Sequence, residues 1–393
     1  MPWHASTVEG YIKNMKVLVT GGAGFIGSHT VDLLLEKGYE VRVLDLLQPR
    51  VHPYGKPKYL SNEAEFIQGD VADKDVIIKA LEGVEGVFHL AAYQDYMKDF
   101  SNFIKANTYS TALLFEIIVE KKLNIRKIVF ASSQSVYGEG KYKCKVHGIQ
   151  YPDSRNVEQL EKSDWEMHCP QSGCSNYLES VLIDEAVTNP FTAYGISKEG
   201  LDRLAHKLGR RYSIPTASMR YSIVQGPRNS FFNAYSGVCR IFTLRLINGK
   251  SPVIYEDGKQ QRDYVHVLDV ARANVIAFED QGTKCEAYNV GGEKGINLID
   301  YTKTLIKVIG KDVESQIPGL YRYGDTRHTV SSSEKLKKLG WKNEYSLEDI
   351  FRDYVKWVYE QPDIKDRYEE VEQIMKKQNV LRQAKSLVKE TRT

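Results

Sequence analysis

Short apolar runs alternate with helical patterns along most of the chain. Residues 16–20 form such a run, and a helical pattern through Leu33, Leu34 and Leu35 follows it. Similar runs recur at residues 41–44, 66–67, 86–90, 127–131 and 217–220. This alternation predicts an α/β fold with a doubly wound parallel sheet, in which ligands bind at the carboxyl ends of the strands.

Length and charge narrow the class of protein. A chain of 393 residues with 42% hydrophobic content can bury a large core, and about 150 residues per domain predicts two lobes. The net charge of +3 gives no reason to expect a nucleic-acid partner. There is no run of about 18 apolar residues and no signal-peptide pattern, so we expect no membrane partner and take the cytoplasm as the default location.

A glycine-rich turn follows the first apolar run. Gly21, Gly24 and Gly27 have the spacing of a dinucleotide-binding fingerprint, and Phe25 and Ile26 lie between the last two glycines. The first glycine allows a tight turn, the second lets backbone amides approach a pyrophosphate, and the third lets helix and strand pack closely. The sequence therefore predicts a Rossmann-type cofactor site here.

Asp45 ends the second predicted strand, eighteen residues after Gly27. A carboxylate at this place accepts hydrogen bonds from the adenosine ribose and repels a 2′-phosphate, so NAD is favoured over NADP. Arg50, which is close in sequence, is a weak signal in the other direction. We expect further cofactor contacts at the ends of the next strands, from Asp70, Val71, Leu90, Ala91 and Ala92.

The predicted elements divide the chain into a cofactor domain, an insertion, a smaller lobe and a tail. We expect an NAD-binding Rossmann domain from residues 15–221 with 250–288, an insertion at 139–190, a C-terminal substrate-binding lobe from 222–249 and 289–361, and a charged helical tail at 362–393. Val371, Ile374 and Met375 lie at helical spacing in the tail, and Leu381 and Ala384 continue that spacing. Packing of the tail onto the body is the default expectation.

Three side chains predict the reaction site. Tyr194 and Lys198 lie one helical turn apart, and Ser133 stands at the end of a predicted strand. A free phenol titrates near ~10, but a nearby ammonium and a cationic nicotinamide would favour the phenolate. We expect Tyr194 to be the base, with Ser133 and Lys198 completing the catalytic set and Tyr194 and Lys198 also contacting the cofactor.

With these motifs, residues 15–361 resemble an extended short-chain dehydrogenase/reductase of the nucleotide-sugar epimerase/dehydratase family. In that family the catalytic hydroxyl lies four residues before a Tyr-Gly pair, and here the pair 137–138 selects Ser133. The resemblance also implies a homodimer that forms through the helix of Tyr194.

The same resemblance implies roles for side chains outside the catalytic set. Asn107 matches a helix asparagine near the cofactor, and Arg262 matches a contact to the substrate pyrophosphate. Arg322 and Asp325 match the residues that hold the diphosphate and the nucleotide ribose. Guanidinium groups suit phosphate because they donate two parallel hydrogen bonds.

Gln134 and Ser135 stand where the 4,6-dehydratases of the family carry an acid and a base. Neither side chain exchanges protons near neutral pH, so dehydration is not expected. The stretch 235–260 resembles the branch of dTDP-L-rhamnose 4-epimerase and UDP-glucose 4-epimerase. This favours an isomerase that inverts C4 through a transient 4-keto sugar, with hydride returned from tightly bound NADH. An NAD(P)-dependent oxidoreductase of nucleotide sugars and a non-catalytic NAD sensor stay open as alternatives.

The insertion carries a second candidate site. Cys144 and His147 form one hook and Cys169 and Cys174 another, and together they could present three thiolates and an imidazole to a structural zinc ion. His168 is a possible substitute for His147. The alternatives are unlinked thiols or a disulfide, which a cytoplasmic setting disfavours. Members of the resembled branch carry a similar cysteine-rich insertion, whereas Cys239 and Cys285 are expected in the core.

Overall fold

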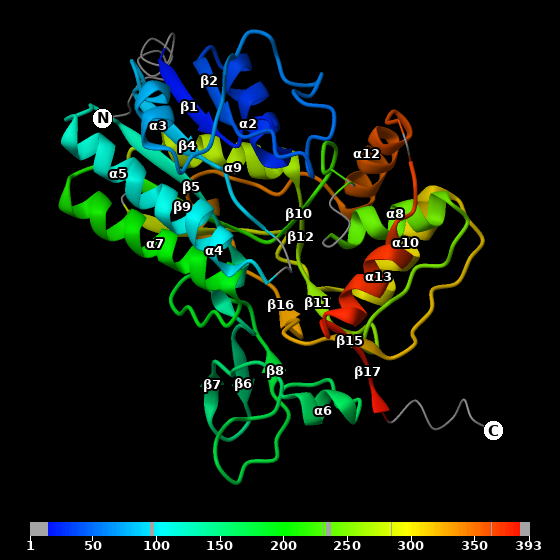
Figure 1. Ribbon diagram of the computed structural model, residues 1–393. Coiled ribbons are helices and arrows are strands. Elements are labelled where there is room, and N and C mark those ends of the chain that lie inside the picture. The colour runs from blue at the N-terminus through cyan, green and yellow to red at the C-terminus, as the bar shows by residue number, and fades with distance from the viewer. Residues whose placement is uncertain are drawn as a thin grey trace.

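The computed structural model describes residues 15–94, 98–230, 232, 237–283, 285–362 and 364–385. A large part built on a parallel sheet and a smaller helical part lie side by side, and a small sheet projects below them (Figure 1). Residues 235 and 236 of the stretch 235–260, and the tail beyond residue 385, lie outside the described residues.

A seven-stranded parallel sheet forms the centre of the large part. Its order is β13 (Glu286–Val290), β9 (Thr216–Tyr221), β5 (Lys127–Ser133), β4 (Gly86–His89), β1 (Lys16–Thr20), β2 (Glu40–Asp45) and β3 (Glu65–Gln68). The strand order reverses between β1 and β4, which is the place where open α/β sheets bind ligands. The predicted α/β fold and its parallel sheet are confirmed.

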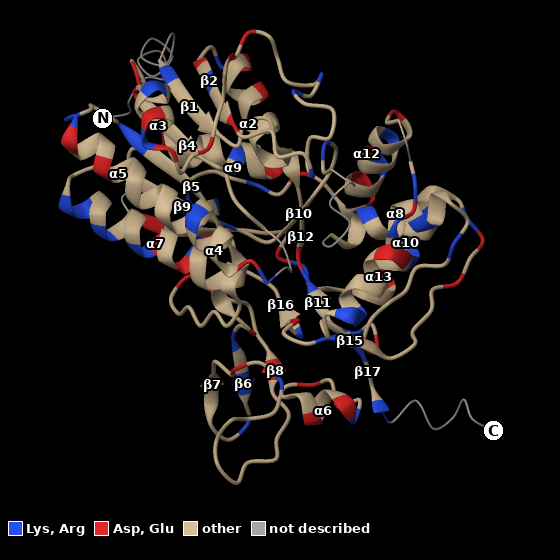
Figure 2. Cartoon of the chain, in the orientation of Figure 1, with Lys and Arg blue, Asp and Glu red and all other residues tan. Residues whose placement is uncertain are grey.

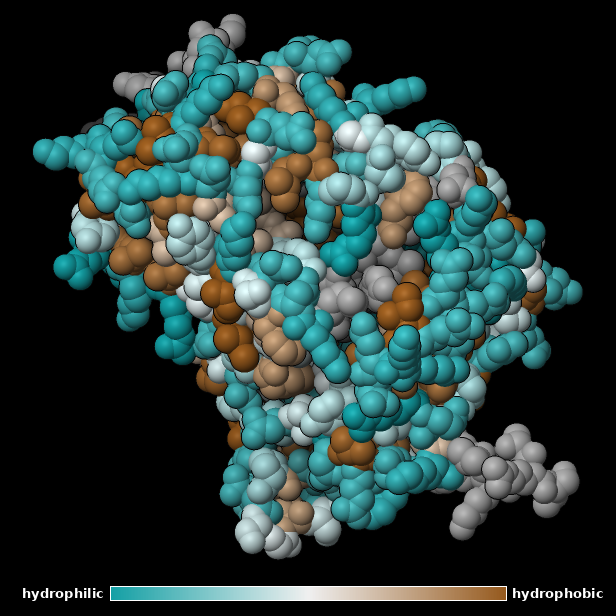
Figure 3. Space-filling view, viewed as in Figure 1, coloured by the Kyte–Doolittle hydropathy of each residue, from teal (hydrophilic) through white to brown (hydrophobic). Residues whose placement is uncertain are grey.

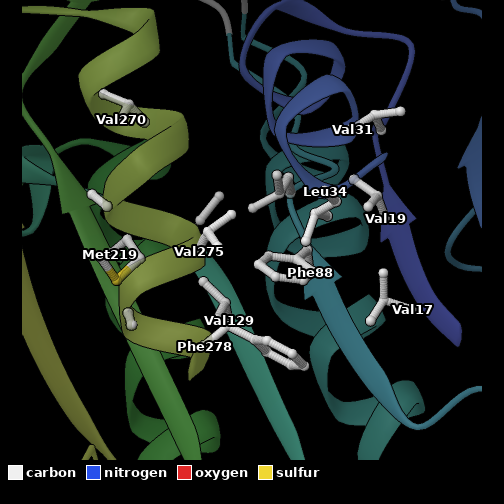
Figure 4. Packing of buried hydrophobic residues seen from close by; sticks show 14 of the residues in the cluster. Val17, Val19, Val31, Leu34, Phe88, Val129, Met219, Val270, Val275 and Phe278 are labelled. Atoms are coloured by element: carbon white, nitrogen blue, oxygen red, sulfur yellow. The ribbon is translucent and has the colours of Figure 1, made fainter. Parts of the chain in front are cut away.

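Alternating side chains of β1 build two cores, one on each face of the sheet. Val17 and Val19 pack under α2 (Phe25–Glu36) and α9 (Val267–Glu279), where Phe88 and Phe278 also meet with ring centroids 4.8 Å apart (Figure 4). Leu18 faces the other side, covered by α3 (Lys74–Ala80), α5 (Ser110–Glu120) and α7 (Ala193–Arg211). Each buried side chain of this size contributes about 1.5–3 kcal/mol.

The helix before α5 is irregular. It begins as α4 (Phe100–Phe103), continues as a single π-helical segment, η1 (Ile104–Tyr109), and then becomes α5. Segments of this kind are often found at functional sites. After β5 a short 3₁₀ turn, η2 (Gln134–Tyr137), leads toward the insertion.

The smaller part is mainly helical. Its core lies between α8 (Val238–Ile247), α10 (Leu298–Ile309) and α12 (Leu347–Tyr359). Short strands join it to the large part: β10 (Ile223–Gln225) pairs with β12 (Tyr264–His266), and β11 (Gln261–Arg262) pairs with β14 (Ile296–Asn297) and β16 (His328–Thr329). A short helix, α11 (Glu334–Lys337), returns the chain toward β13.

The insertion folds as its own small sheet. Strand β6 (Tyr142–Cys144) lies between β7 (Gly148–Gln150) and β8 (Glu179–Ser180), with helix α6 (Val157–Glu161) beside them (Figure 1). Tyr142, Cys144 and Met167 are among the residues of its small core.

The tail packs on the body, but the prediction that it is helical throughout is wrong. Helix α13 (Tyr368–Lys377) ends before Asn379, whose φ is +58°. The chain then forms β17 (Leu381–Gln383), which pairs in the antiparallel direction with β15 (Leu320–Arg322). The open edge of β15 supplies backbone hydrogen bonds that the local pattern of Leu381 and Ala384 does not reveal.

Residues of both charge signs are spread over the described elements. Lys and Arg alternate with Asp and Glu over both parts of the molecule (Figure 2), in keeping with the net charge of +3. Among the described residues, none of the helices combines the length and the apolar character that crossing a bilayer requires.

Candidate active site

One cleft of about 580 Å³ runs from the glycine turn, past the ends of β4 and β5, to the helices of the smaller part. Most of the predicted site residues line it: Gly21, Gly24, Phe25, Ile26, Gly27, Asp45, Asp70, Val71, Leu90, Ala91, Ala92, Ser133, Tyr194, Arg262, Arg322 and Asp325. The structure thus brings together side chains that are more than 300 residues apart in sequence.

The glycine turn has no room for side chains. A Cβ on Gly27 would lie 2.1 Å from the carbonyl oxygen of Gly21, and one on Gly21, whose φ is +68°, would lie 2.8 Å from the backbone of Ala91. Gly24 precedes the first turn of α2 and offers no side-chain cap, so backbone N–H groups face the cleft. A dinucleotide pyrophosphate fits this environment, because a helix N-terminus attracts anions.

Asp45 is fixed at the end of β2. Its carboxylate accepts hydrogen bonds from the amides of Ala23 (3.0 Å) and Leu47 (2.8 Å). Arg50 lies near it on the cleft with its guanidinium 5.5 Å from the ring centroid of Tyr93. A carboxylate held in this way suits the hydroxyls of a ribose better than a phosphate.

Helix α7 presents Tyr194 and Lys198. Thr192 caps the helix by accepting a hydrogen bond from the amide of Gly195 (3.0 Å). One turn further on, Lys198 Nζ donates to the carbonyl of Ala131 on β5 (2.6 Å) and lies 5.9 Å from the centroid of the Tyr194 ring. The helix start and the strand therefore fix both side chains relative to Ser133.

Burial shifts the two pKa values toward the neutral forms. Desolvation raises the pKa of Tyr194 to about 12, against a smaller lowering by the hydrogen bond with Ser133. Desolvation also lowers the pKa of Lys198 to about 7, partly offset by Asp202. The side chains of this chain thus do not by themselves stabilise the phenolate, and a cationic cofactor ring is the group that could.

Ser133 and the two residues that follow it carry no acidic or basic side chain. Ser133 Oγ accepts a hydrogen bond from the amide of Ser135 (3.1 Å) and donates to Ser135 Oγ (3.2 Å), while Gln134 is buried. Neither neighbour exchanges protons near neutral pH, so these two positions offer no acid–base pair for an elimination.

Asn107 and Lys198 are buried and are not among the residues that line the cleft. Asn107 is fully buried in η1, where its amide donates to Ser197 Oγ (2.9 Å) and to the carbonyl of Tyr93 (3.1 Å) and accepts from the Tyr93 amide (3.0 Å). The side chain therefore ties the loop after β4 to the helix of Tyr194. Lys198 is 1% exposed and lies behind Tyr194.

Arg262 and Arg322 stand further along the cleft. Arg262 donates to the carbonyls of Thr326 (2.5 Å) and Arg327 (2.9 Å), and Arg322 Nε pairs with Asp325 (2.9 Å). Both guanidinium groups thus converge on the loop 322–327. Two arginines on one cleft are a suitable site for a diphosphate.

A buried ionic network, which no sequence pattern predicts, supports that loop. Arg155 of the insertion pairs with Glu256 (2.8 Å), and Arg327 binds Glu256 (3.0 Å) and Asp257 (2.7 Å). Arg327 also contacts Glu166 of the insertion (2.5 Å). These partners are spread along the chain and no motif joins them, so only the fold reveals the network.

The cysteine and histidine side chains of the insertion form one cluster. The ligand atoms of Cys144, His147, Cys169 and Cys174 all lie within 4.8 Å of one another. Hydrogen bonds from the backbone amides of His147 and Val146 lower the pKa of the Cys144 thiol to about 6. A thiol that ionises readily is a better metal ligand.

The alternatives for the insertion find less support in this geometry. The Sγ atoms of Cys144 and Cys174 are 3.9 Å apart, well beyond a disulfide bond of about 2.05 Å. His168, the possible substitute ligand, instead pairs with Asp164 (2.6 Å) and packs on the ring of Tyr177. Cys239 and Cys285 are buried, as expected for core residues.

The chain is similar to known proteins over most of its length. The family described as "NAD dependent epimerase/dehydratase family" matches residues 17–157 and 173–291. The dTDP-L-rhamnose 4-epimerase of Burkholderia thailandensis is 30% identical over 371 residues, which cover 92% of this chain and 99% of that protein.

Solved structures show the same arrangement of the chain. The UDP-glucose 4-epimerase of Thermotoga maritima, solved with UDP-glucose, aligns with a TM-score of 0.72 and 30% identity over 88% of this chain and 99% of that one. The UDP-glucuronic acid 4-epimerase of Bacillus cereus, in complex with UDP-glucuronic acid and NAD, aligns with a TM-score of 0.71 and 25% identity over 87% and 98% of the two chains.

Proposed function

Since the chain belongs to the NAD-dependent epimerase/dehydratase family, we propose that it inverts C4 of a nucleotide sugar through a transient 4-keto sugar. One observation carries the proposal: Ser133 and Tyr194 share a cleft with the glycine turn and with Arg262, while Gln134 and Ser135 offer no acid or base for dehydration. Redox chemistry at a single carbinol carbon is what such a site supports.

Each side chain has a task that follows from its position. NAD, when bound between the glycine turn and Asp45, supplies hydride exchange and a positive ring. Tyr194 accepts the proton of the sugar 4-hydroxyl, and Ser133 hydrogen-bonds the same oxygen. Lys198, whose Nζ lies 5.9 Å from the centre of the phenol ring, stabilises the phenolate when it is protonated. Arg262 and Arg322 hold the diphosphate, so that the sugar can turn and present its other face.

The fate of the hydride distinguishes an epimerase from an oxidoreductase and from a non-catalytic sensor. The purified protein would be incubated with UDP-, dTDP- and GDP-sugars, while the absorbance of reduced nicotinamide and the stereochemistry of the sugar are followed. Inversion at C4 without net change in the cofactor supports the epimerase. Stoichiometric consumption of nicotinamide would replace it by a nucleotide-sugar oxidoreductase, and tight NAD binding with no reaction on any sugar would favour a sensor.

The cluster of the insertion supports a structural zinc ion. Cys144, His147, Cys169 and Cys174 offer four ligand atoms within 4.8 Å of one another, which is the number and the kind of ligand that a tetrahedral zinc site takes. All four positions would be taken by the protein, so the ion would have no open position for substrate. Its task would be to hold the two hooks of the insertion together.

The outer surface of α4, η1 and α7 supports a homodimer. Phe100 is 60% exposed and Ile104, Tyr109 and Ile196 are each more than 45% exposed. Hydrophobic residues show among the hydrophilic ones over the α4 and α5 side of the molecule (Figure 3). A second copy covering this surface would bury these side chains. The five unbonded cysteines suit a reducing compartment, and we therefore propose the cytoplasm.

A further inference from the structure

The end of the cleft beyond Arg322 is walled by the C-terminal helix. Tyr368, Val371 and Met375 of α13 line this part of the cleft, opposite Ile241 of α8. All three α13 side chains are less than 10% exposed. In Figure 1, α13 lies across the helices of the smaller part, above the strands β15 and β17.

Helix α13 packs against other residues of the smaller part that line or border the cleft. The α13 side chains share a hydrophobic cluster with Val253, Leu320 and Leu381, and Tyr255 packs against it. The hydroxyls of Tyr255 and Tyr368 are 3.3 Å apart, and the guanidinium of Arg245 lies 4.5 Å from the centre of the Tyr368 ring. These contacts hold the helix in one position on the cleft.

The same segment is joined to the arginine that faces the diphosphate. Leu381 of β17 pairs with Arg322 of β15, so the backbone that carries Arg322 is bonded to the strand that follows α13. The wall and the arginine are therefore parts of one local structure.

The groups that line the cleft indicate which part of a substrate α13 would meet. Tyr194 and Ser133 mark the reacting sugar, and Arg262 and Arg322 mark the diphosphate. In a nucleoside diphosphate sugar, the group beyond the diphosphate is the nucleoside. Its base has two flat faces, which aromatic and thioether side chains can cover.

We propose that α13 forms the wall of the nucleoside subsite and that Tyr368, Val371 and Met375 determine which base the enzyme accepts. The inference rests on the proposed function for the class of substrate, and it adds the residues that discriminate among bases. Val371 and Met375 would contact one side of the base. The rings of Tyr368 and Tyr255 would limit how far the base enters the subsite.

Nucleoside diphosphates without a sugar test this assignment. The full-length, NAD-saturated protein would be titrated calorimetrically with UDP, dTDP, GDP and inorganic diphosphate. We expect Val371→Ala and Met375→Ala to weaken binding of the preferred nucleoside diphosphate at least fivefold, to change its ratio to the others, and to leave inorganic diphosphate within twofold. Tyr368→Phe, which keeps the ring, is a milder variant that should change the ratio without unfolding the chain.

Ile374→Ala is the matched control, because Ile374 lies on the same helix but is 37% exposed and does not line the cleft. Unchanged nucleoside diphosphate affinity in folded α13 variants would overturn the inference. An equal loss of affinity for inorganic diphosphate would also overturn the inference, because it would show that the substitutions act by displacing Arg322. Binding needs no turnover, so a protein that inverts no sugar yet shows the base-dependent losses would refute the proposed reaction and keep the subsite.

Discussion

Arg155 Nη2 donates a hydrogen bond to the backbone carbonyl of Asp325 at 2.9 Å. The first residue belongs to the Cys/His insertion and the second to the loop 322–327, which borders the cleft. Because the same guanidinium also binds Glu256 through both terminal nitrogens, at 2.9 and 2.8 Å, the insertion and this loop are held by one buried group.

Removal of the Arg155 guanidinium should destabilise both the insertion and the loop 322–327. Arg155→Met leaves Glu256 with Arg327 as its remaining partner and frees the Asp325 carbonyl. We expect a loss of about 3–5 kcal/mol in unfolding free energy, since one partner of a buried pair is removed, and a higher KM for the nucleotide sugar. Urea unfolding and steady-state kinetics measure the two effects.

Arg126→Met is the control for Arg155, because Arg126 forms an exposed ion pair with Glu85 at 2.8 Å. Such pairs are worth about 0–1 kcal/mol. Equal losses of unfolding free energy in the two variants would contradict a stabilising role for the buried Arg155 side chain.

The Tyr194 hydroxyl should carry the proton transfer. Tyr194→Phe keeps the ring on α7 but has no exchangeable proton, so we expect kcat to fall by about 100-fold to 10,000-fold with little change in NAD affinity. Turnover assays and NAD titration provide the comparison. Tyr212→Phe, at the exposed end of the same helix, should keep full activity, and a Tyr194→Phe enzyme that is equally active would require another base.

Lys198 should make stability depend on pH in the alkaline range. Its pKa is lowered to about 7 from the ordinary value of 10.5, so between these pH values the unfolded chain binds more protons than the folded one. Its contribution to stability therefore rises from pH 7 toward pH 10.5 and is lost as pH falls back through 7.

Lys198→Met removes this titration. The difference in unfolding free energy between the variant and the parent, measured in urea at several pH values, should favour the variant most near pH 7 and shrink toward pH 10. A difference that stays constant with pH would show that Lys198 is not desolvated in the folded chain.

The zinc proposal predicts a stoichiometric ion. Elemental analysis of protein purified without chelator should find about one zinc per chain, and Cys169→Ser should lose it together with several degrees of Tm. Cys285→Ser, which keeps a donor for the Ile214 carbonyl, should retain the metal. Metal-free protein with an unchanged Tm would contradict the assignment.

The proposed dimer can be tested at α7. Ile196 is 48% exposed, and Ile196→Glu would place a charge in the buried interface. We expect light scattering to change from a dimer of this chain to a monomer. Ile374→Glu, on α13, should leave the mass unaltered, while a parent protein that is already monomeric would exclude the interface.

Local patterns accounted for the sheet and for most of the cleft. The runs at 16–20, 41–44 and 127–131 alternate with helical patterns, and strands form at each of them because burial on both faces of a parallel sheet needs such runs. Gly27 packs against Gly21, which is only six residues away in sequence. The spacing of the glycines was therefore sufficient to predict the turn.

Contacts between distant segments could not be predicted in this way. Arg155 and Glu256 are 101 residues apart, and nothing in either neighbourhood specifies the other. The spacing of Val371 and Met375 predicted a helix but not the surface that it covers. The resemblance to the family suggested that Asn107 lies on a helix near the cofactor, but the sequence does not show that its amide bonds with Tyr93 and Ser197.

The pairing of β15 with β17 depends on the last part of the described chain. The side chain of Gln383 bonds back to the carbonyl of Pro318 across 65 residues, whereas the glycine turn, Asp45 and Tyr194 lie in the first half of the sequence. Removal of the chain after α12 would therefore leave β15 as an unpaired edge while keeping the residues of the glycine turn. Because an unpaired edge strand tends to pair with another chain, we expect such a truncated protein to self-associate.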